Sequence, residues 1–349
     1  MTRAVWAALT AVVSVALLVG FVGDCQAVEY RMHVLDDLPG MGLGCALDIT
    51  DSGRIVGSSS YDTGMHLCYW DSSGVHDLHY GLGSNITPVS INNAGTITSV
   101  MDVWSNNTWV QLPGLIAPPY GMGEYFGINE SGCIVGDANI NTAWVYHACL
   151  WDSTGPHDLG TLAGQTSSTA CGINDHGQIV GVSGTKAFIW DKNVMSPIDI
   201  PAGYAKSSAW RINNLGQVIG SCTKYTQWGP QNTAFIWQDH TWTKIGVGAW
   251  DTFAKGINDA GQVVGYYTDV VGGTNNAFVW QDGQWTTLPG LGNGTCAYGI
   301  NEDGWIVGQA YTSDGRHYKA VVWEPVPEPS AIIVLMGGIG GLAAIRRRR

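Results

Sequence analysis

The side chains in this sequence that could do chemistry include two His-Cys pairs, His66-x-Cys68 and His147-x-Cys149. Residues two apart in an extended segment point to the same side, so each pair could present two zinc ligands. The pairs lie in the first and third of the repeats described below, which are not neighbours, so a shared zinc site is not expected. Both repeats share the phrase Trp-Asp-Ser-x-Gly-x-His-Asp-Leu, and duplication explains the echo.

A second candidate set follows a recurring Ile-Asn dipeptide (once Ile-Thr), and five of its seven members are carboxylates. Closing the repeats into a ring would gather these side chains at one rim. Calcium prefers six to eight oxygens, usually several from one loop, whereas each loop here supplies one side chain. Calcium binding is therefore the less favoured interpretation. The residues are Asp51, Asn93, Glu130, Asp175, Asn214, Asp259 and Glu302.

The Asn of the same dipeptide is better explained by turn formation than by binding. Asn bonds its own backbone two residues on, and the Gly that follows tolerates positive φ, so together they make a tight hairpin. The residues are Asn92, Asn129, Asn174, Asn213, Asn258 and Asn301.

No catalytic motif accompanies these residues. The sequence has no Ser elbow with a nearby His and Asp, no distinctive pair of carboxylates and no phosphate-binding loop. It predicts no catalytic residue, no cofactor and no metal site.

These residues are positioned by a repeat that predicts four short strands. The first strand ends at Ile-Asn, the second is an Ile-Val-Gly run, the third is Ala-Phe-x-Trp, and the fourth leads to Leu-Pro-Gly. The Ile at 49, 91, 128, 173, 212, 257 and 300 are spaced by 42, 37, 45, 39, 45 and 43 residues. Such a period is typical of a β-propeller blade. The Trp residues that end the third strand are expected in the core: Trp70, Trp151, Trp190, Trp237, Trp280 and Trp323.

The two ends of the array predict a closed ring. The last copy stops at Trp323-Glu324-Pro325 without a fourth strand, while the first begins with a segment that leads to Leu38-Pro39-Gly40. A propeller pairs its ends in this way and so removes an exposed sheet edge. We expect Tyr30–Leu35 to pair with Lys319–Trp323. The predicted fold is all-β, a propeller of about seven four-stranded blades, with helices only in the terminal signal and tail.

The sequence leaves the second repeat and the cysteines open. Only 9 residues separate Gly95 from Trp104, so that blade is expected to be distorted or to lack a strand. Seven cysteines remain after residue 27, an odd number that leaves at least one unpaired. Cys133–Cys149 is a conceivable disulfide, and buried free thiols are the expectation for most of the others.

The chain ends carry targeting features. Residues 1–27 look like a secretory signal, with Arg3, an apolar stretch and Cys25-Gln26-Ala27 before the cleavage point. Asp24 disfavours lipid attachment at Cys25. At the other end, Val326-Pro327-Glu328-Pro329-Ser330 precedes a short apolar span at 331–345, and four arginines end the chain: Arg346, Arg347, Arg348 and Arg349. These arginines should stay cytoplasmic, leaving the body outside.

The tail resembles the PEP-CTERM sorting signal, whose order of Pro-Glu-Pro, short apolar span and Arg cluster it follows. That resemblance implies an exosortase-like protease as partner, besides signal peptidase, with transient membrane anchoring through the tail and delivery to the envelope, surface or matrix of a bacterium. The repeats resemble the extracellular HAF repeat, which implies a secreted module without an established activity. The expected domains are a signal peptide (1–27), a HAF-repeat propeller (28–325) and a sorting tail (326–349).

Charge narrows the choice of partners. Without residues 1–27 and everything from Glu328, the chain has 26 acidic and 11 basic residues, a net charge of −15. Such a surface repels nucleic acid and anionic membranes.

The variable loops between the second and third strands are the candidate ligand surface, because binding residues concentrate on loops over a rigid scaffold. Aromatic, amide and hydroxyl groups there suit sugars, so extracellular polysaccharide is the expected ligand of a non-catalytic binding module. Two alternatives remain: a polysaccharide hydrolase or lyase, which predicts at least two perturbed carboxylates converging in the central channel, and a scaffold for proteins only. The candidate residues are Tyr225, Trp228, Tyr266, Tyr267 and Tyr311.

Overall fold

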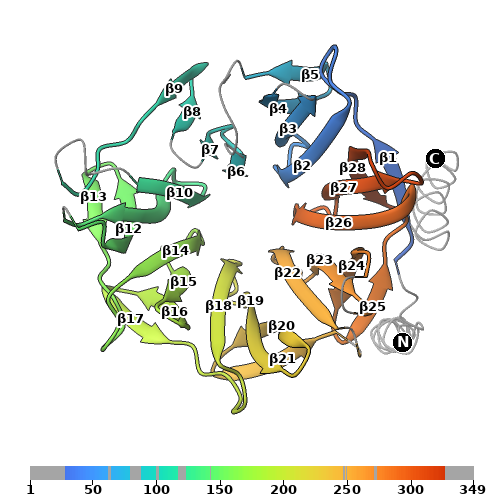
Figure 1. Cartoon of the computed structure of the whole chain (residues 1–349). Coiled ribbons are helices and arrows are strands. Elements are labelled where there is room, and N and C mark those ends of the chain that lie inside the picture. Colours follow the sequence, from blue (N-terminus) through green and yellow to red (C-terminus); the bar gives the residue numbers. More distant parts are fainter. Residues whose placement is uncertain are drawn as a thin grey trace, which may run out of the picture.

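The computed structural model describes residues 28–326, apart from 62–63, 79–87, 100–101, 117–122, 142, 247, 249 and 271–272. In this part of the chain the secondary structure consists of strands β1 to β28, without helices. They form seven four-stranded antiparallel sheets around a central axis (Figure 1), which confirms the predicted seven-bladed propeller. The predicted signal peptide (1–27), the membrane segment (331–345) and the terminal helices lie outside the described residues.

The first four blades follow one another along the chain, each running from the axis outward. Blade 1 contains β2 (Leu43–Ile49), β3 (Ile55–Tyr61), β4 (Gly64–Asp71) and β5 (Gly74–Asp77). Blade 2 contains β6 (Pro88–Ile91), β7 (Ile97–Ser99), β8 (Val103–Ser105) and β9 (Thr108–Val110). Blade 3 contains β10 (Gly123–Ile128), β11 (Ile134–Asn139), β12 (Tyr146–Asp152) and β13 (Gly155–Asp158). Blade 4 contains β14 (Ser168–Ile173), β15 (Ile179–Ser183), β16 (Lys186–Asp191) and β17 (Val194–Pro197).

The remaining blades complete the ring. Blade 5 contains β18 (Lys206–Ile212), β19 (Val218–Thr226), β20 (Gly229–Gln238) and β21 (Thr241–Ile245). Blade 6 contains β22 (Asp251–Ile257), β23 (Val263–Thr268), β24 (Asn276–Gln281) and β25 (Gln284–Thr287). Blade 7 contains β26 (Gly292–Ile300), β27 (Ile306–Thr312), β28 (Tyr318–Pro325) and, as its outermost strand, β1 (Tyr30–Val34).

The ring closes as the sequence predicts. β1 pairs antiparallel with β28 from Tyr30↔Pro325 to Val34↔Val321, and the Leu35 amide donates to the Ala320 carbonyl at 2.9 Å. Figure 1 shows the two strands side by side. The first strand of the described chain thereby covers the edge that β28 would otherwise expose.

The second repeat is a complete blade. All of β6 to β9 are present and paired in order, so no strand is missing. They are the shortest set in the ring, with 4, 3, 3 and 3 residues, and the short chain between Gly95 and Trp104 limits the lengths of β7 and β8.

A β-bulge in each innermost strand explains the Gly that ends the Ile-Val-Gly run. Between Ala170 and Gly172 the pairing with β15 shifts register, and the corresponding shift occurs in every blade. The bulge brings the Thr169 carbonyl oxygen to 2.0 Å from where a Cβ of Gly181 would lie. Only glycine fits there, and Phe188 of the next strand lies opposite it.

The hydrophobic core consists of seven clusters, one at each junction between neighbouring blades. Between blades 4 and 5, for example, Val180 and Ala187 pack with Val218 and Phe235. Fully burying a side chain such as Phe235 contributes about 1.5–3 kcal/mol. The junctions between blades therefore hold the ring together and fix the surfaces that two blades build jointly.

Candidate functional site

The hairpins that join the first and second strands of each blade are linked around one face of the ring. In blade 5, the Asn213 Oδ1 accepts a hydrogen bond from the backbone N–H of Gln217 at 2.9 Å, which confirms the predicted role of this Asn in the turn. The Asn213 Nδ2 also donates to the Asn258 carbonyl of blade 6 at 2.9 Å. The same inter-blade bond is made by Asn92, Asn129, Asn174, Asn258 and Asn301, at 3.0–3.2 Å.

The acidic and amide residues that follow these asparagines form a second, closed ring. The Glu130 amide donates to the Asp175 carboxylate at 2.9 Å, and the Glu302 amide donates to Asp51 at 3.1 Å. The other five junctions repeat this backbone-to-side-chain bond. These seven side chains therefore act as acceptors that tie each blade to its neighbour.

The rim enclosed by this second ring is acidic. It lines a cavity of about 180 Å³. Burial, together with neighbouring carboxylates, raises the pKa of Glu130 and of Glu302 above the ordinary value for Glu. Among the described residues, no group of three or more His, Cys, Asp or Glu side chains is arranged to hold a metal ion.

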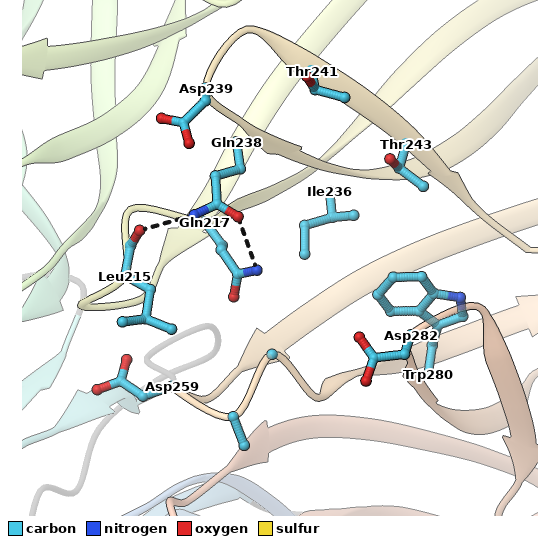
Figure 2. A pocket seen from close by; sticks show the side chains of 12 residues that line it. Leu215, Gln217, Ile236, Gln238, Asp239, Thr241, Thr243, Asp259, Trp280 and Asp282 are labelled. Carbon is cyan, nitrogen blue, oxygen red and sulfur yellow. Dashed lines mark hydrogen bonds between the residues drawn. The ribbon is translucent and has the colours of Figure 1, made fainter. Parts of the chain in front are cut away.

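A larger groove of about 430 Å³ lies on the same face, between blades 5 and 6 (Figure 2). Blade 5 supplies Gln217, the end of β20 and two hydroxyls of β21. Blade 6 supplies the hairpin at 259–261, the Trp280 indole and the turn after it. The twelve lining residues are Leu215, Gln217, Ile236, Gln238, Asp239, Thr241, Thr243, Asp259, Ala260, Gly261, Trp280 and Asp282.

Two hairpin turns place the aspartates of this groove. Asp239 and His240 have φ of 47° and 61°, and Asp282 and Gly283 have φ of 49° and 83°. Positive φ at both central residues is the geometry of a type I′ turn, which Asp and Gly tolerate. Both carboxylates are exposed, and neither has a hydrogen-bond partner among the residues that the structure describes. Asp259 differs, because its carboxylate accepts a hydrogen bond from the backbone N–H of Asn214 at 2.7 Å.

Amides form one side of the groove. The Gln217 Nε2 donates to the Gln238 Oε1 at 3.2 Å, and the Gln238 Nε2 donates to the Leu215 carbonyl at 3.3 Å, as Figure 2 shows. The Trp280 ring lies on the opposite side with Asp282 beside it. The groove thus combines an aromatic face, two free carboxylates, amides and hydroxyls, a set that binds polar ligands with apolar faces.

The predicted aromatic residues do not form one surface. Tyr225 and Trp228 share the β19–β20 hairpin and are 62% and 70% exposed. Their turn is fixed by the Thr226 Oγ1, which accepts the Trp228 amide at 3.1 Å. This hairpin lies at the end of blade 5 opposite the groove, because successive turns of an antiparallel blade lie at alternate ends.

The other three predicted residues are engaged in packing. Tyr266 contacts Phe253 with ring centroids 5.2 Å apart, and burial raises its pKa to about 12. Tyr267 packs on Trp285 at 5.1 Å, and its hydroxyl lies 3.2 Å from that of Thr287. Tyr311 contacts Tyr318 at 5.6 Å.

The innermost strands carry charged groups that contact other residues of the protein. The Asp48 Oδ2 accepts the Ser90 hydroxyl at 2.8 Å and the Ile91 amide at 3.0 Å. Burial raises the pKa of Asp48, and the Arg211 guanidinium opposes that shift. The ammonium of Lys255 lies 5.5 Å from the Trp210 ring centroid, and burial lowers its pKa.

Another carboxylate with a raised pKa, Asp137 on β11, lies in blade 3. Burial raises its pKa to about 6, and its Oδ2 accepts the Thr169 hydroxyl at 2.8 Å.

The remaining candidates have structural surroundings. His66 pairs with Asp77 at 3.0 Å, and His147 pairs with Asp158 at 2.9 Å. The seven described cysteines are free thiols, so Cys133–Cys149 is not a disulfide. Among the third-strand tryptophans, Trp190 and Trp280 are half-buried. The other four are buried as expected: Trp70, Trp151, Trp237 and Trp323.

The main groove lies at a place for which the sequence has no clear signal. Gln217 and Gln262 follow the hairpin glycines, and Gln238 and Gln281 follow the third-strand tryptophans, so recurring amides were visible. Their meeting within a blade depends on the pairing of β19 with β20 and of β23 with β24.

The fold and site define a seven-bladed β-propeller with a polar groove between two blades. The family model of the PEP-CTERM protein-sorting motif matches residues 325–349, which confirms the resemblance of the tail. This motif is the signal recognised by an exosortase and implies export to the cell envelope or surface. Its predicted key residues lie outside the described part of the chain: Pro327, Glu328, Pro329, Arg346, Arg347, Arg348 and Arg349. Within the described part, no helix is long and apolar enough to cross a membrane.

Comparison with known proteins does not indicate an activity for this chain. No curated protein matches the sequence. Among solved structures, TolB from Acinetobacter baumannii is similar, with 13% identity, a TM-score of 0.40 and coverage of 79% of this chain and 64% of that one. Dipeptidyl peptidase 4 from Porphyromonas gingivalis has 10% identity, a TM-score of 0.41 and coverage of 78% and 51%. Trypanosoma rangeli sialidase has 10% identity, a TM-score of 0.40 and coverage of 88% and 57%. The chain thus spans less than two thirds of each, and the similarity carries no information on function.

Proposed function

We propose that this protein is an exported, non-catalytic binding module that holds extracellular polysaccharide in the groove between blades 5 and 6. The observation that carries the proposal is the composition of that groove. An indole, free carboxylates, amides and the Thr241 and Thr243 hydroxyls surround about 430 Å³ of open space. Sugar rings have apolar faces that stack on indole and hydroxyls that bond to amides and carboxylates.

The two ends of the chain would direct export of the protein. Signal peptidase would remove residues 1–27, and the tail from 326 would anchor the protein transiently through its apolar span at 331–345 until an exosortase cleaves it. The body at 28–325 would then act outside the cell as a propeller of HAF repeats. Mass spectrometry of the exported protein tests this part, because an intact Arg346–Arg349 in a surface fraction would contradict removal of the tail.

The binding test compares two tryptophans at the same position of different blades. Trp280 and Trp190 both end a third strand and both are half-buried, but only Trp280 lines the groove. We expect Trp280→Ala to weaken binding to the producer's exopolysaccharide at least tenfold, since central aromatic contacts dominate binding energy. Trp190→Ala carries a similar packing cost and should bind like the wild type.

The outcome separates the candidate functions. Equal loss in both variants, or in neither, would contradict binding at this groove. Release of shortened or unsaturated sugar products by the wild type would indicate the alternative hydrolase or lyase. Binding of proteins without any glycan would indicate a protein scaffold.

The exposed aromatic hairpin is a second proposed contact for the same ligand. Tyr225 and Trp228 present their rings to solvent on the face opposite the groove. A Tyr225→Ala/Trp228→Ala variant should lose part of the retention on immobilised polysaccharide while the groove remains intact. Unchanged retention would remove the hairpin from the binding surface.

A further inference from the structure

We infer that the groove between blades 5 and 6 selects polysaccharide whose sugars carry free amines. The inference rests on the proposed function and names the ligand class from the charge of the groove. A sugar ring would lie against the Trp280 indole with its ammonium at the Asp282 carboxylate, and the ammonium of another sugar in the same chain would lie at Asp239 across the groove.

The two carboxylates are available to a ligand. Asp239 lies on the blade 5 side and Asp282 on the blade 6 side, so they face the groove from opposite sides (Figure 2). Both are exposed and without a hydrogen-bond partner among the described residues. The turn geometry accounts for a short polar residue at each position, but Asn would satisfy the same φ without a charge. We therefore expect the negative charge of these two side chains to attract the ligand.

The other acidic cluster on this face is already occupied by the protein. Each rim side chain, such as Glu130 or Asp175, accepts a backbone amide from the neighbouring blade. Asp259, the third carboxylate of the groove, also belongs to that ring. Asp239 and Asp282 do not, and they are the carboxylates in the groove that a ligand can use without breaking a link between blades.

The aromatic face favours the same ligand. A cation near the face of an indole is attracted by the ring quadrupole, and tryptophan is the strongest partner for this interaction. In Figure 2 the Asp282 carboxylate lies beside the Trp280 ring, so one ammonium could contact both.

Acidic polysaccharides would be disfavoured. None of the twelve residues that line the groove is Lys or Arg, and three are aspartates. The region between the signal and the tail has 26 acidic and 11 basic residues. A chain of uronate sugars would meet repulsion both at the groove and at longer range.

The test uses the exported protein and three probes: glucosamine oligosaccharides, their fully N-acetylated counterparts and alginate oligosaccharides. We expect the wild type to bind the free amine about tenfold more tightly than the acetylated form at low salt, since two exposed ion pairs each contribute a few-fold. That preference should shrink as salt rises, because exposed charges are screened. Alginate should not bind.

The matched variants remove two charges each. Asp239→Asn/Asp282→Asn keeps residues that tolerate positive φ and should abolish the amine preference while binding of the acetylated form persists. Asp199→Asn/Asp269→Asn makes the same charge change at exposed positions that do not line the groove, and should keep the preference. Equal binding of amine and acetylated forms, or binding of alginate, would overturn the inference and leave polysaccharide binding in place. Failure of every glycan to bind the wild type would overturn the proposed function as well.

Discussion

Replacing Asn213 should show that the propeller is held together on its turn face by asparagine side chains. Asn213 is 5% exposed, accepts the Gln217 amide at 2.9 Å and donates to the Asn258 carbonyl of the next blade at 2.9 Å. An Asn213→Ala variant loses these two bonds, and also the bond from the Asn213 Nδ2 to the Gln217 Oε1 at 2.8 Å and the bond from the Leu215 backbone N–H to the Asn213 Oδ1 at 3.1 Å, and it leaves buried backbone groups unsatisfied. A net hydrogen bond contributes about 1 kcal/mol and an unsatisfied buried group costs about 1–3 kcal/mol, so the free energy of unfolding should fall by about 2–4 kcal/mol.

Urea and thermal unfolding of the exported protein measure this loss. With an unfolding entropy of about 2.1 cal/mol/K per residue, a propeller of about 300 residues shifts by about 1.6 °C per kcal/mol, so we expect the midpoint to fall by about 3–6 °C. Asn213→Asp separates the acceptor role from the donor role, because its oxygens keep the turn acceptor but cannot donate to the Asn258 carbonyl or to the Gln217 Oε1 at neutral pH. It should therefore also be destabilised. Asn193→Asp, an exposed turn position that tolerates the same change in charge, is the control and should unfold like the wild type.

The result that would refute this reasoning is a midpoint for Asn213→Ala within about 1 °C of the wild type, since even one lost net hydrogen bond exceeds that. An Asp variant as stable as the wild type would show that the turn acceptor alone matters and that the donor bonds of Asn213, including the link to blade 6, contribute nothing.

Three further perturbations follow from the structure. In the folded protein the pKa of Asp137 is about 6 instead of 3.8, so its contribution to stability is present below pH 3.8 and is lost as pH rises through 6. The free energy of unfolding should therefore fall by roughly 1.4 kcal/mol between pH 5 and pH 8. Urea unfolding of Asp137→Asn should show no such fall. An unchanged pH slope in that variant would contradict the assignment. Deleting residues 28–34 removes the strand that covers β28, and the truncated chain should unfold earlier and self-associate in light scattering; a monomer of wild-type stability would argue against closure by β1. Burial raises the pKa of Cys171 and of Cys222 to about 12, so a thiol reagent should label the half-exposed Cys133 first in the native protein, and rapid labelling of all cysteines would show that the blades open readily.

Most of the fold could be predicted from the sequence because each blade repeats its turn residues. Gly177 and its counterparts mark hairpins whose backbone only a few residue types adopt, and the strand that the last repeat lacks stands at Tyr30. The bulge in each innermost strand was not foreseen, although the Gly at the end of each Ile-Val-Gly run is its trace. A bulge depends on how two strands pair, and the amino-acid sequence of one strand does not determine that pairing.

The groove could not be predicted for a related reason. Asp282 has a local explanation as a turn residue, and Trp280 resembles its buried counterparts in other blades. What distinguishes them is the neighbouring blade, where Thr241, Thr243 and Asp239 face them across a gap. Repeats report the structure of one blade, whereas the groove arises from the placement of two.

The most direct test of binding at this groove is a crystal structure of the exported protein with a glucosamine oligosaccharide. We predict a sugar ring stacked on Trp280 with its amine within hydrogen-bond distance of Asp282, and the amine of another sugar at Asp239. An oligosaccharide bound at the Tyr225–Trp228 hairpin or in the central channel, with the groove empty, would contradict the central claim.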